Sequence, residues 1–132
     1  MENRTVLFVD DDTVIRMALQ RDLKDEPYNK LFAKSAEEAL EIVQTKDVHV
    51  IVTDMRMPGI GGLDLLRIVK DGYPNIIRLV LSGYMQPTTL LTAINDGEIF
   101  KYITKPWKGE GQLKRIIREA IDLYNLRNVA VH

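Results

Sequence analysis

Several short apolar runs in this 132-residue sequence end in polar side chains that could do chemistry. The polar side chains at the ends of these runs belong to Asp10, Asp11, Asp12, Asp54, Ser82 and Lys105. If the runs are neighbouring parallel strands, their carboxyl ends lie at one edge of the sheet, where open sheets bind ligands. The sequence therefore predicts one site that gathers carboxylates, a hydroxyl and an ammonium group.

The chemistry that suits this set is phosphoryl transfer beside a hard cation. Converging carboxylates repel one another, so such a site keeps a proton or recruits a cation, and an all-oxygen cluster suits Mg²⁺ or Mn²⁺. A cation held there could also bind phosphate oxygens and leave one carboxylate free to attack phosphorus, giving an acyl phosphate. Lys105 and Ser82 would then bind the remaining oxygens as a point charge and a hydrogen-bond donor.

The elements that must position these residues alternate along the chain. Short runs rich in β-branched residues are separated by segments of helical period, which predicts βα units and a parallel sheet. Strands are expected at residues 6–9, 30–33, 48–53, 76–81 and 99–103, and helices at about 15–23, 36–43, 62–71, 87–95 and 113–128. This order predicts an α/β, flavodoxin-like (βα)5 three-layer sandwich with a parallel five-stranded sheet of order 2-1-3-4-5.

Length and composition limit the alternatives. A chain of 132 residues fits a single domain, with residues of about 4–127 expected to be structured. A formal net charge of −1 gives no electrostatic reason to expect nucleic acid or an anionic membrane as a partner. The sequence has no cysteine, no apolar run near the length of a membrane span and no apolar N-terminal stretch of the signal-peptide kind. We therefore expect a cytoplasmic protein without thiol chemistry.

Some polar residues are better explained by local structure than by chemistry. Asp12 lies directly before a predicted helix, where an aspartate most often caps the N-terminus, and Thr13 favours the same role. Ser35 followed by Glu38 has the spacing of a capping box. His49 lies within a strand candidate and is expected to be a satisfied structural histidine rather than a ligand.

Four segments, in order, resemble the receiver domains of response regulators, and the resemblance covers essentially the whole chain. Any one segment would be weak evidence, but all four occur at the spacing of that family. The segments are Phe8-Val9-Asp10-Asp11, Val52-Thr53-Asp54-Met55-Arg56-Met57-Pro58-Gly59, Leu81-Ser82-Gly83 and Tyr102-Ile103-Thr104-Lys105-Pro106. The resemblance implies a phosphoacceptor domain of a two-component signalling system.

The resemblance implies a role for each matching acidic residue. Asp54 would be the phosphoacceptor, and Asp10 and Asp11 would be the acidic pair that organises Mg²⁺. Asp54 itself and the backbone carbonyl of Arg56 would be further metal ligands.

The resemblance also implies a switch. Ser82 would be the hydroxyl that moves toward the phosphoryl group, and Lys105 the lysine that pairs with it. Tyr102 would be the aromatic residue whose rotamer follows Ser82. The peptide bond before Pro106 would be cis, which turns the lysine into the site; a cis bond is cheap only before proline.

Two positions tune dephosphorylation in this family, and here both carry large side chains. They are Arg56, two residues after the acceptor, and Tyr84, two residues after the switch hydroxyl. We expect them to shield the phosphoryl group from water and to lengthen its lifetime.

Partners follow from the same resemblance. The phosphoryl donor would be a histidine kinase or a phosphotransfer protein. The fourth helix, fifth strand and fifth helix would form the face that meets a second copy or, if the chain is a fragment, its own output domain. Residues 82–84 and 94–107 look like a subgroup often joined to HD-GYP cyclic-di-GMP phosphodiesterase domains.

Two other functions stay open at this point. Residues 6–14 also fit the opening of a haloacid dehalogenase-type phosphohydrolase, in which Asp10 would be the nucleophile. That family needs a second acidic cluster late in its core, and the acids after Lys105 are isolated. The other alternative is a receiver-like interaction module that works without phosphorylation; such members usually lose an acidic residue or the lysine, and both are present here.

Overall fold

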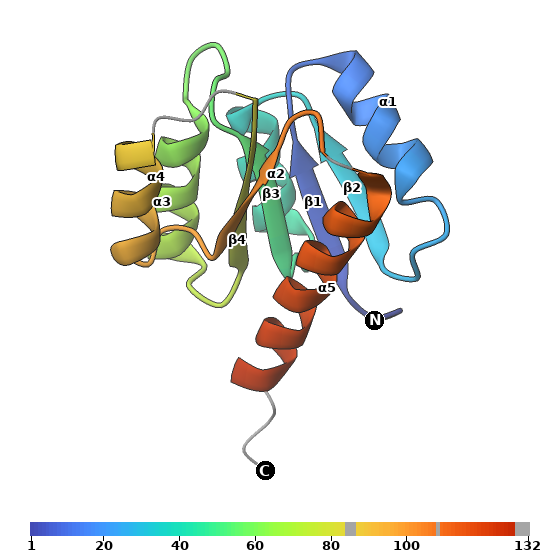
Figure 1. Cartoon of the computed structure of the whole chain (residues 1–132). Helices are drawn as coiled ribbons and strands as arrows, with labels where there is room; N and C mark the ends of the chain where they lie inside the picture. The colour runs from blue at the N-terminus through green and yellow to red at the C-terminus, as the bar shows by residue number, and fades with distance from the viewer. Residues whose placement is uncertain (84–86, 108, 129–132) are drawn as a thin grey trace.

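The computed structural model describes residues 1–83, 87–107 and 109–128, and in these residues the predicted (βα)5 architecture is confirmed (Figure 1). The parallel strands form one sheet in the order β2-β1-β3-β4-β5. The strands are β1 (Thr5–Val9), β2 (Asn29–Ala33), β3 (Val50–Asp54), β4 (Ile77–Ser82) and β5 (Lys101–Thr104). The helices are α1 (Thr13–Asp22), α2 (Ala36–Thr45), α3 (Gly62–Gly72), α4 (Pro87–Asn95) and α5 (Gly109–Arg127). Within the described ranges, no helix has both the length and the apolarity to cross a lipid bilayer.

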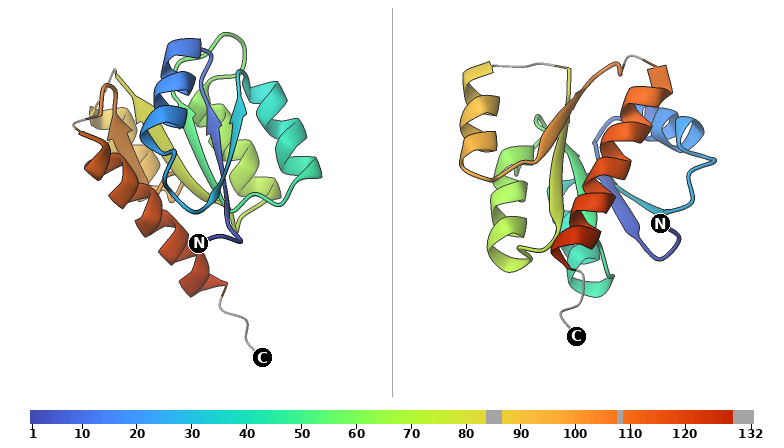
Figure 2. Two further views of the ribbon diagram at one scale, coloured as in Figure 1. Left: turned by 90° about the vertical axis from the view of Figure 1, so that its right-hand side faces the viewer. Right: turned by 60° about the horizontal axis from the view of Figure 1, so that its bottom comes forward.

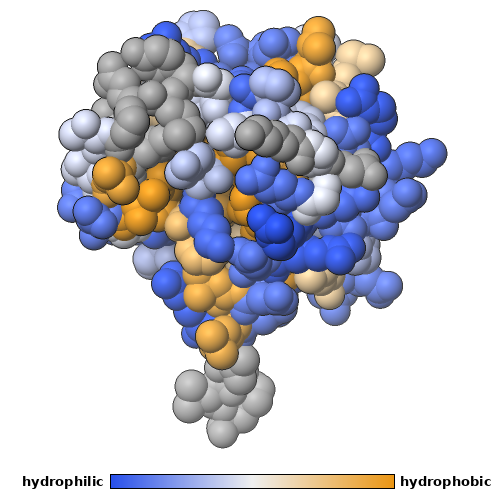
Figure 3. Space-filling view, viewed as in Figure 1, coloured by the Kyte–Doolittle hydropathy of each residue, from blue (hydrophilic) through white to orange (hydrophobic). Residues whose placement is uncertain are grey.

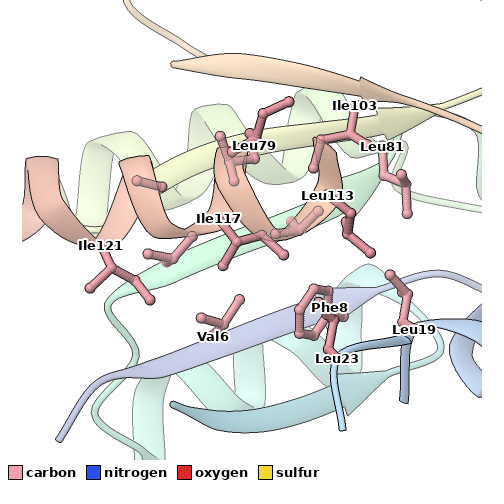
Figure 4. Close-up of a cluster of buried hydrophobic side chains, with 14 of the residues drawn as sticks. Val6, Phe8, Leu19, Leu23, Leu79, Leu81, Ile103, Leu113, Ile117 and Ile121 are labelled. Carbon is pink, nitrogen blue, oxygen red and sulfur yellow. The ribbon is translucent and has the colours of Figure 1, made fainter. Parts of the chain in front are cut away.

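Side chains on the sheet alternate between two apolar cores, one on each face. Phe8 of β1 packs with α1 and α5, whereas its neighbour Leu7 packs with α2 and α3. Figures 1 and 2 show these helix pairs on opposite faces of the sheet, and Figure 4 shows Phe8 close to Leu23 and Leu113 in the first core. Each fully buried leucine or phenylalanine contributes about 1.5–3 kcal/mol. Because helices cover both faces, the inner strands β1, β3 and β4 are mostly apolar and lack the alternation of a one-sided sheet.

The helix caps predicted from sequence are confirmed at α1 and α2. Asp12 is the N-cap of α1, and its Oδ1 accepts a hydrogen bond from the Val14 N–H at 2.9 Å. Ser35 is the N-cap of α2, and its Oγ accepts from the Glu38 N–H at 3.1 Å. Each cap satisfies one of the backbone donors that a helix leaves unpaired at its start, which contributes about 1 kcal/mol.

The fifth strand begins later than the sequence predicts, at Lys101 rather than at residue 99. The carbonyl oxygens just before it accept hydrogen bonds from a side chain instead of a strand. The Arg78 guanidinium of β4 donates to the carbonyls of Gly97 and Glu98, each at 2.9 Å. Gly97 also has a φ of 73°, which turns the chain before β5 can start. Similarly, β3 begins at Val50 rather than at residue 48.

His49 is a structural histidine, as predicted, although it lies immediately before β3 rather than within the strand. Its Nδ1 accepts a hydrogen bond from the Thr5 N–H at 2.9 Å, and its ring meets Tyr124 edge-on. Burial lowers the pKa of His49; the nearby carboxylate of Asp47 opposes this shift without cancelling it. The neutral ring is therefore the form that the fold prefers.

This preference predicts a pH-dependent stability. Because the folded-state pKa of His49 lies below its unfolded value, the stabilisation is complete above that unfolded value and is lost as the pH falls through the folded value. We expect the free energy of unfolding to fall between about pH 7.5 and about pH 5.5, and to fall less in His49→Asn. Asparagine can still accept from Thr5 but does not titrate. Urea unfolding of the wild type and His49→Asn at both pH values tests this prediction. If the free energy of unfolding falls equally in the two proteins, His49 is not the cause.

Candidate functional site

The strand ends bring the predicted polar residues to one edge of the sheet. Asp10 follows β1, Asp54 ends β3, Ser82 ends β4 and Lys105 follows β5. In register, Val9 lies opposite Thr53, so Asp10 and Asp54 stand side by side where the strand order reverses. Ser82 lies opposite Thr104, one residue before Lys105. Four separate strand ends therefore supply one site.

Three carboxylates form a cluster suited to a cation. Asp10, Asp11 and Asp54 each offer an oxygen, and these oxygens lie within 4.8 Å of one another. Asp10 and Asp54 are buried, whereas Asp11 is exposed. A set of carboxylate oxygens from two adjacent strand ends has the donor chemistry of Mg²⁺ or Mn²⁺. The residues present therefore fit a hard divalent cation.

The Asp10 carboxylate is fixed through both of its oxygens. Oδ1 accepts a hydrogen bond from the Asp12 N–H at 2.9 Å, and Oδ2 lies 3.0 Å from the Lys105 ammonium. The Asp10 side chain is only 1% exposed. Asp54 is more accessible: its Oδ1 lies 3.4 Å from the same ammonium, the Arg56 backbone N–H bonds to its carboxylate, and its side chain is 10% exposed. Lys105 thus bridges the two buried acids.

The charges of the site do not balance. Burial raises the pKa of Asp54, and although the positive charge of Lys105 opposes this shift, the pKa stays above its ordinary value. Asp10 adds to the rise through its own negative charge. For Lys105, burial alone would lower the pKa, but the hydrogen bond to Asp10 and the charges of Asp10 and Asp54 outweigh it and raise the pKa. One ammonium facing several carboxylates leaves an excess of negative charge that a cation would neutralise.

The loop after β5 places the lysine. The Lys105–Pro106 peptide bond is cis, and the Lys105 N–H donates to the Ser82 carbonyl at 3.0 Å. Trp107 packs against the core shared by α1 and α5, and its Nε1 donates to Asp22 at 2.8 Å. These contacts tie the lysine to β4 on one side and to α1 on the other.

The two predicted switch residues lie in different surroundings. Ser82 is buried at 3% exposure, at the end of β4. Tyr102 is 37% exposed and lines a groove of about 300 Å³ at the edge of the sheet beside α5. The Tyr102 ring therefore lies at the surface, whereas Ser82 lies in the interior.

The two predicted dephosphorylation-tuning positions can be placed only in part. Arg56 is exposed, two residues beyond Asp54, and its backbone N–H bonds to the Asp54 carboxylate. Tyr84 lies outside the described residues.

Gly62 is a contributor to the site that the sequence reveals only as a helix start. The first turn of α3 packs directly on the backbone of the acceptor candidate, and the Gly62 N–H donates to the Met55 carbonyl at 3.0 Å. A Cβ placed on Gly62 would stand 2.0 Å from the Asp54 carbonyl oxygen and 2.8 Å from its carbon. No side chain fits there without moving Asp54.

We expect Gly62→Ala to destabilise the fold by about 1–3 kcal/mol and to slow any reaction of Asp54. The matched control is Gly72→Ala at the other end of α3, where a Cβ would meet no atom within 4 Å. Alanine at position 72 should leave stability unchanged or slightly higher. Chemical denaturation of both variants measures the difference, and similar stabilities would contradict the close packing.

Arg16 is the second residue that the sequence analysis missed. Its guanidinium donates to the Asp10 carbonyl at 2.6 Å and to the Thr13 hydroxyl at 3.1 Å. Thr13 is thus the first residue of α1 and an acceptor for Arg16, not the N-cap. A cation near the start of a helix is unfavourable with the helix dipole, and this is the signal that could have drawn attention to it.

Comparison with known proteins agrees with the geometry. Residues 6–118 match the family model for the response regulator receiver domain. The chain is 38% identical to the hydrogenase transcriptional regulatory protein HoxA of Cupriavidus necator over 93% of this chain and 25% of HoxA. The chain spans about a quarter of the length of the curated relatives it matches.

Solved structures give the same result. The signal receiver domain of an HD domain-containing protein from Pseudomonas fluorescens Pf-5 has a TM-score of 0.86 at 31% identity, covering 92% of this chain and 97% of that one. The response regulator protein TrrA from Thermotoga maritima, solved in complex with Mg²⁺ and BeF, has a TM-score of 0.79 at 25% identity, covering 89% of this chain and 98% of that one.

Proposed function

Because this chain belongs to the response regulator receiver domain family, we propose that it accepts a phosphoryl group on Asp54 and signals by changing the shape of one face. It is a signalling domain, and the only reactions it assists are its own phosphorylation and dephosphorylation. The hydrolase alternative is set aside, since residues 6–118 match the receiver family.

Asp54 is chosen as the acceptor over Asp10 because the carboxylates of these two buried residues differ in how far they are engaged and exposed. Both Asp10 oxygens are engaged, by the Asp12 N–H and by Lys105, and its side chain is 1% exposed. Asp54 has a longer contact of 3.4 Å to Lys105 and keeps a 10% exposed side chain. A nucleophile needs an oxygen that can reach the incoming phosphorus, and Asp54 meets this condition better.

Asp10, Asp11, Asp54 and the Arg56 carbonyl would hold Mg²⁺, or Mn²⁺ in its place. Such an ion supplies charge neutralisation for the phosphate oxygens during transfer. The chain's own contribution is to aim the Asp54 carboxylate and to hold the Lys105 ammonium where charge develops on the phosphoryl group. In the transfer the Asp54 carboxylate forms the new P–O bond while the bond to the donor nitrogen of a phosphohistidine breaks, and the histidine takes a proton from solvent.

The switch begins when the phosphoryl group arrives. Its oxygens would accept a hydrogen bond from Ser82 and pair with Lys105, which draws the buried end of β4 toward Asp54. Tyr102 would then move from the surface into the space beside β4. Phosphorylation would shift the population between two packings of the surface formed by α4, β5 and α5.

The large side chains at positions 56 and 84 would slow hydrolysis of the acyl phosphate. Arg56 follows the acceptor by two residues and is exposed, so it can fold over the phosphoryl group and exclude water. Tyr84, two residues after the switch hydroxyl, would have the same effect.

The α4–β5–α5 surface is the proposed contact for a second copy or for an output domain. Figure 3 shows apolar patches over α4 and along the later turns of α5. Leu91 is 59% exposed there, and the groove beside Tyr102 is partly apolar. The donor would be a histidine kinase or a phosphotransfer protein of the cytoplasm, and HoxA-like and HD-domain outputs both occur among the similar proteins.

Beryllofluoride, which mimics a phosphoryl group on a carboxylate, tests the switch. We expect Mg²⁺ and BeF₃⁻ together to shift the amide resonances of β5 and to change the fluorescence of Trp107. Neither compound alone should do so. If Mg²⁺ binds but Mg²⁺ and BeF₃⁻ together change neither the amide resonances nor the fluorescence, the result would favour an interaction module that works without phosphorylation.

A further inference from the structure

We propose that Arg16 is a positioning residue for the metal pocket, because it fixes the backbone that aims Asp11 at the cation. This inference rests on the function proposed above. It concerns a residue that contacts neither phosphate nor metal and acts through the loop between β1 and α1.

The Arg16 guanidinium binds both ends of the loop between β1 and α1. One amino group, Nη1, donates to the Asp10 carbonyl at 2.6 Å, and the other, Nη2, donates to the Thr13 hydroxyl at 3.1 Å. Asp11 and Asp12 lie between these two anchor points. The guanidinium is planar and rigid, so the two bonds hold the ends of the loop in one relative orientation.

The Asp10 carbonyl belongs to the peptide plane that leads into Asp11, and a peptide unit is planar. Fixing its oxygen therefore fixes the direction of the Asp11 N–Cα bond. Asp11 is exposed, so packing contributes little to its orientation and the backbone must provide it.

The rest of the loop is already fixed around this one peptide. The Asp10 N–H donates to the Ala33 carbonyl at 3.1 Å, and the Asp10 side chain bonds to the Asp12 N–H. The carbonyl is the remaining polar group of Asp10, and Arg16 is its donor. Without that donor the peptide can rotate and carry the Asp11 carboxylate out of the cluster.

Electrostatics alone predicts that loss of Arg16 strengthens Mg²⁺ binding, whereas a positioning role predicts that it weakens binding. A positive charge close to three aspartates repels a divalent cation, so a variant that merely lost the charge would bind Mg²⁺ more tightly or equally. If Arg16 positions the loop, its loss weakens binding. Removing an outer group that orients a metal ligand typically weakens affinity by about 10–100-fold.

The test is a calorimetric Mg²⁺ titration of metal-free wild-type protein, Arg16→Gln, Arg16→Lys and Lys24→Gln. Lys24 is exposed beyond the end of α1, so its variant loses the same charge without touching the loop. We expect about tenfold or greater weakening in Arg16→Gln and no change in Lys24→Gln. Arg16→Lys keeps the positive charge but loses the two-pronged guanidinium, so its Mg²⁺ affinity should lie between those of Arg16→Gln and the wild type. Circular dichroism confirms that each variant is folded.

A second readout separates positioning from a general loss of structure. The rate of phosphorylation by acetyl phosphate in Arg16→Gln should be low at limiting Mg²⁺ and should recover at saturating Mg²⁺. If the wild-type protein binds Mg²⁺ and Arg16→Gln binds it equally or more tightly, the role of Arg16 is overturned and the proposed function is left intact. Absence of Mg²⁺ binding by the wild-type protein contradicts both.

Discussion

Asp54→Asn is expected to abolish phosphorylation while leaving the fold intact. The amide cannot attack phosphorus, and the neighbouring Asp10 is less available because both of its carboxylate oxygens are engaged. The substitution also removes a buried negative charge that Asp10 repels, so the thermal stability of the metal-free protein should be unchanged or higher. Phosphate-affinity gels after incubation with a phosphohistidine donor would measure the loss.

The control for this prediction is Asp71→Asn, which removes an exposed carboxylate near the far end of α3. It should be phosphorylated at the wild-type rate. A labelled Asp54→Asn protein would mean that another residue accepts the group, and the assignment of Asp54 would be wrong.

Lys105→Ala is expected to slow phosphorylation by about two orders of magnitude and to uncouple it from the switch. The ammonium lies 3.0 Å from the Asp10 carboxylate and 3.4 Å from the Asp54 carboxylate, so its loss leaves the incoming phosphoryl charge without this fixed positive partner. Acetyl phosphate would still label the protein slowly. The amide shifts of β5 that accompany labelling in the wild type should be absent.

Stability must be measured beside the rate, because Asp10 is buried and loses an ion-pair partner in this variant. Working at high Mg²⁺ reduces that effect. Lys34→Ala is the matched control, since Lys34 is exposed directly after β2 at the same edge of the sheet. A normal β5 response in labelled Lys105→Ala would remove the lysine from the mechanism.

The fold and the set of site residues could be predicted because both follow from periodic patterns. Parallel strands place their carboxyl ends at one edge, so the sequence pattern alone predicts that distant residues such as Asp10, Asp54 and Lys105 share one site, and the contacts of Lys105 confirm that they lie together. Capping by Asp12 and Ser35 depends on chemistry within three residues and was equally visible.

What could not be predicted depends on contacts between distant segments. The late start of β5 follows from Arg78, a residue of another strand that occupies the carbonyls of Gly97 and Glu98. The close approach of Gly62 to Asp54 depends on how α3 sits on its strand. The Arg16 fork is local in sequence, but its partner is a backbone carbonyl, which no residue pattern displays.

Chemical trapping of the acyl phosphate tests directly whether Asp54 is the phosphoacceptor. The protein is incubated with acetyl phosphate and Mg²⁺ and then reduced with borohydride, which marks the acylated aspartate for peptide mapping. We predict a mark on Asp54 and none on Asp10 or Asp11. A mark on Asp10 would contradict the assignment of Asp54 and restore the hydrolase alternative, in which Asp10 is the nucleophile.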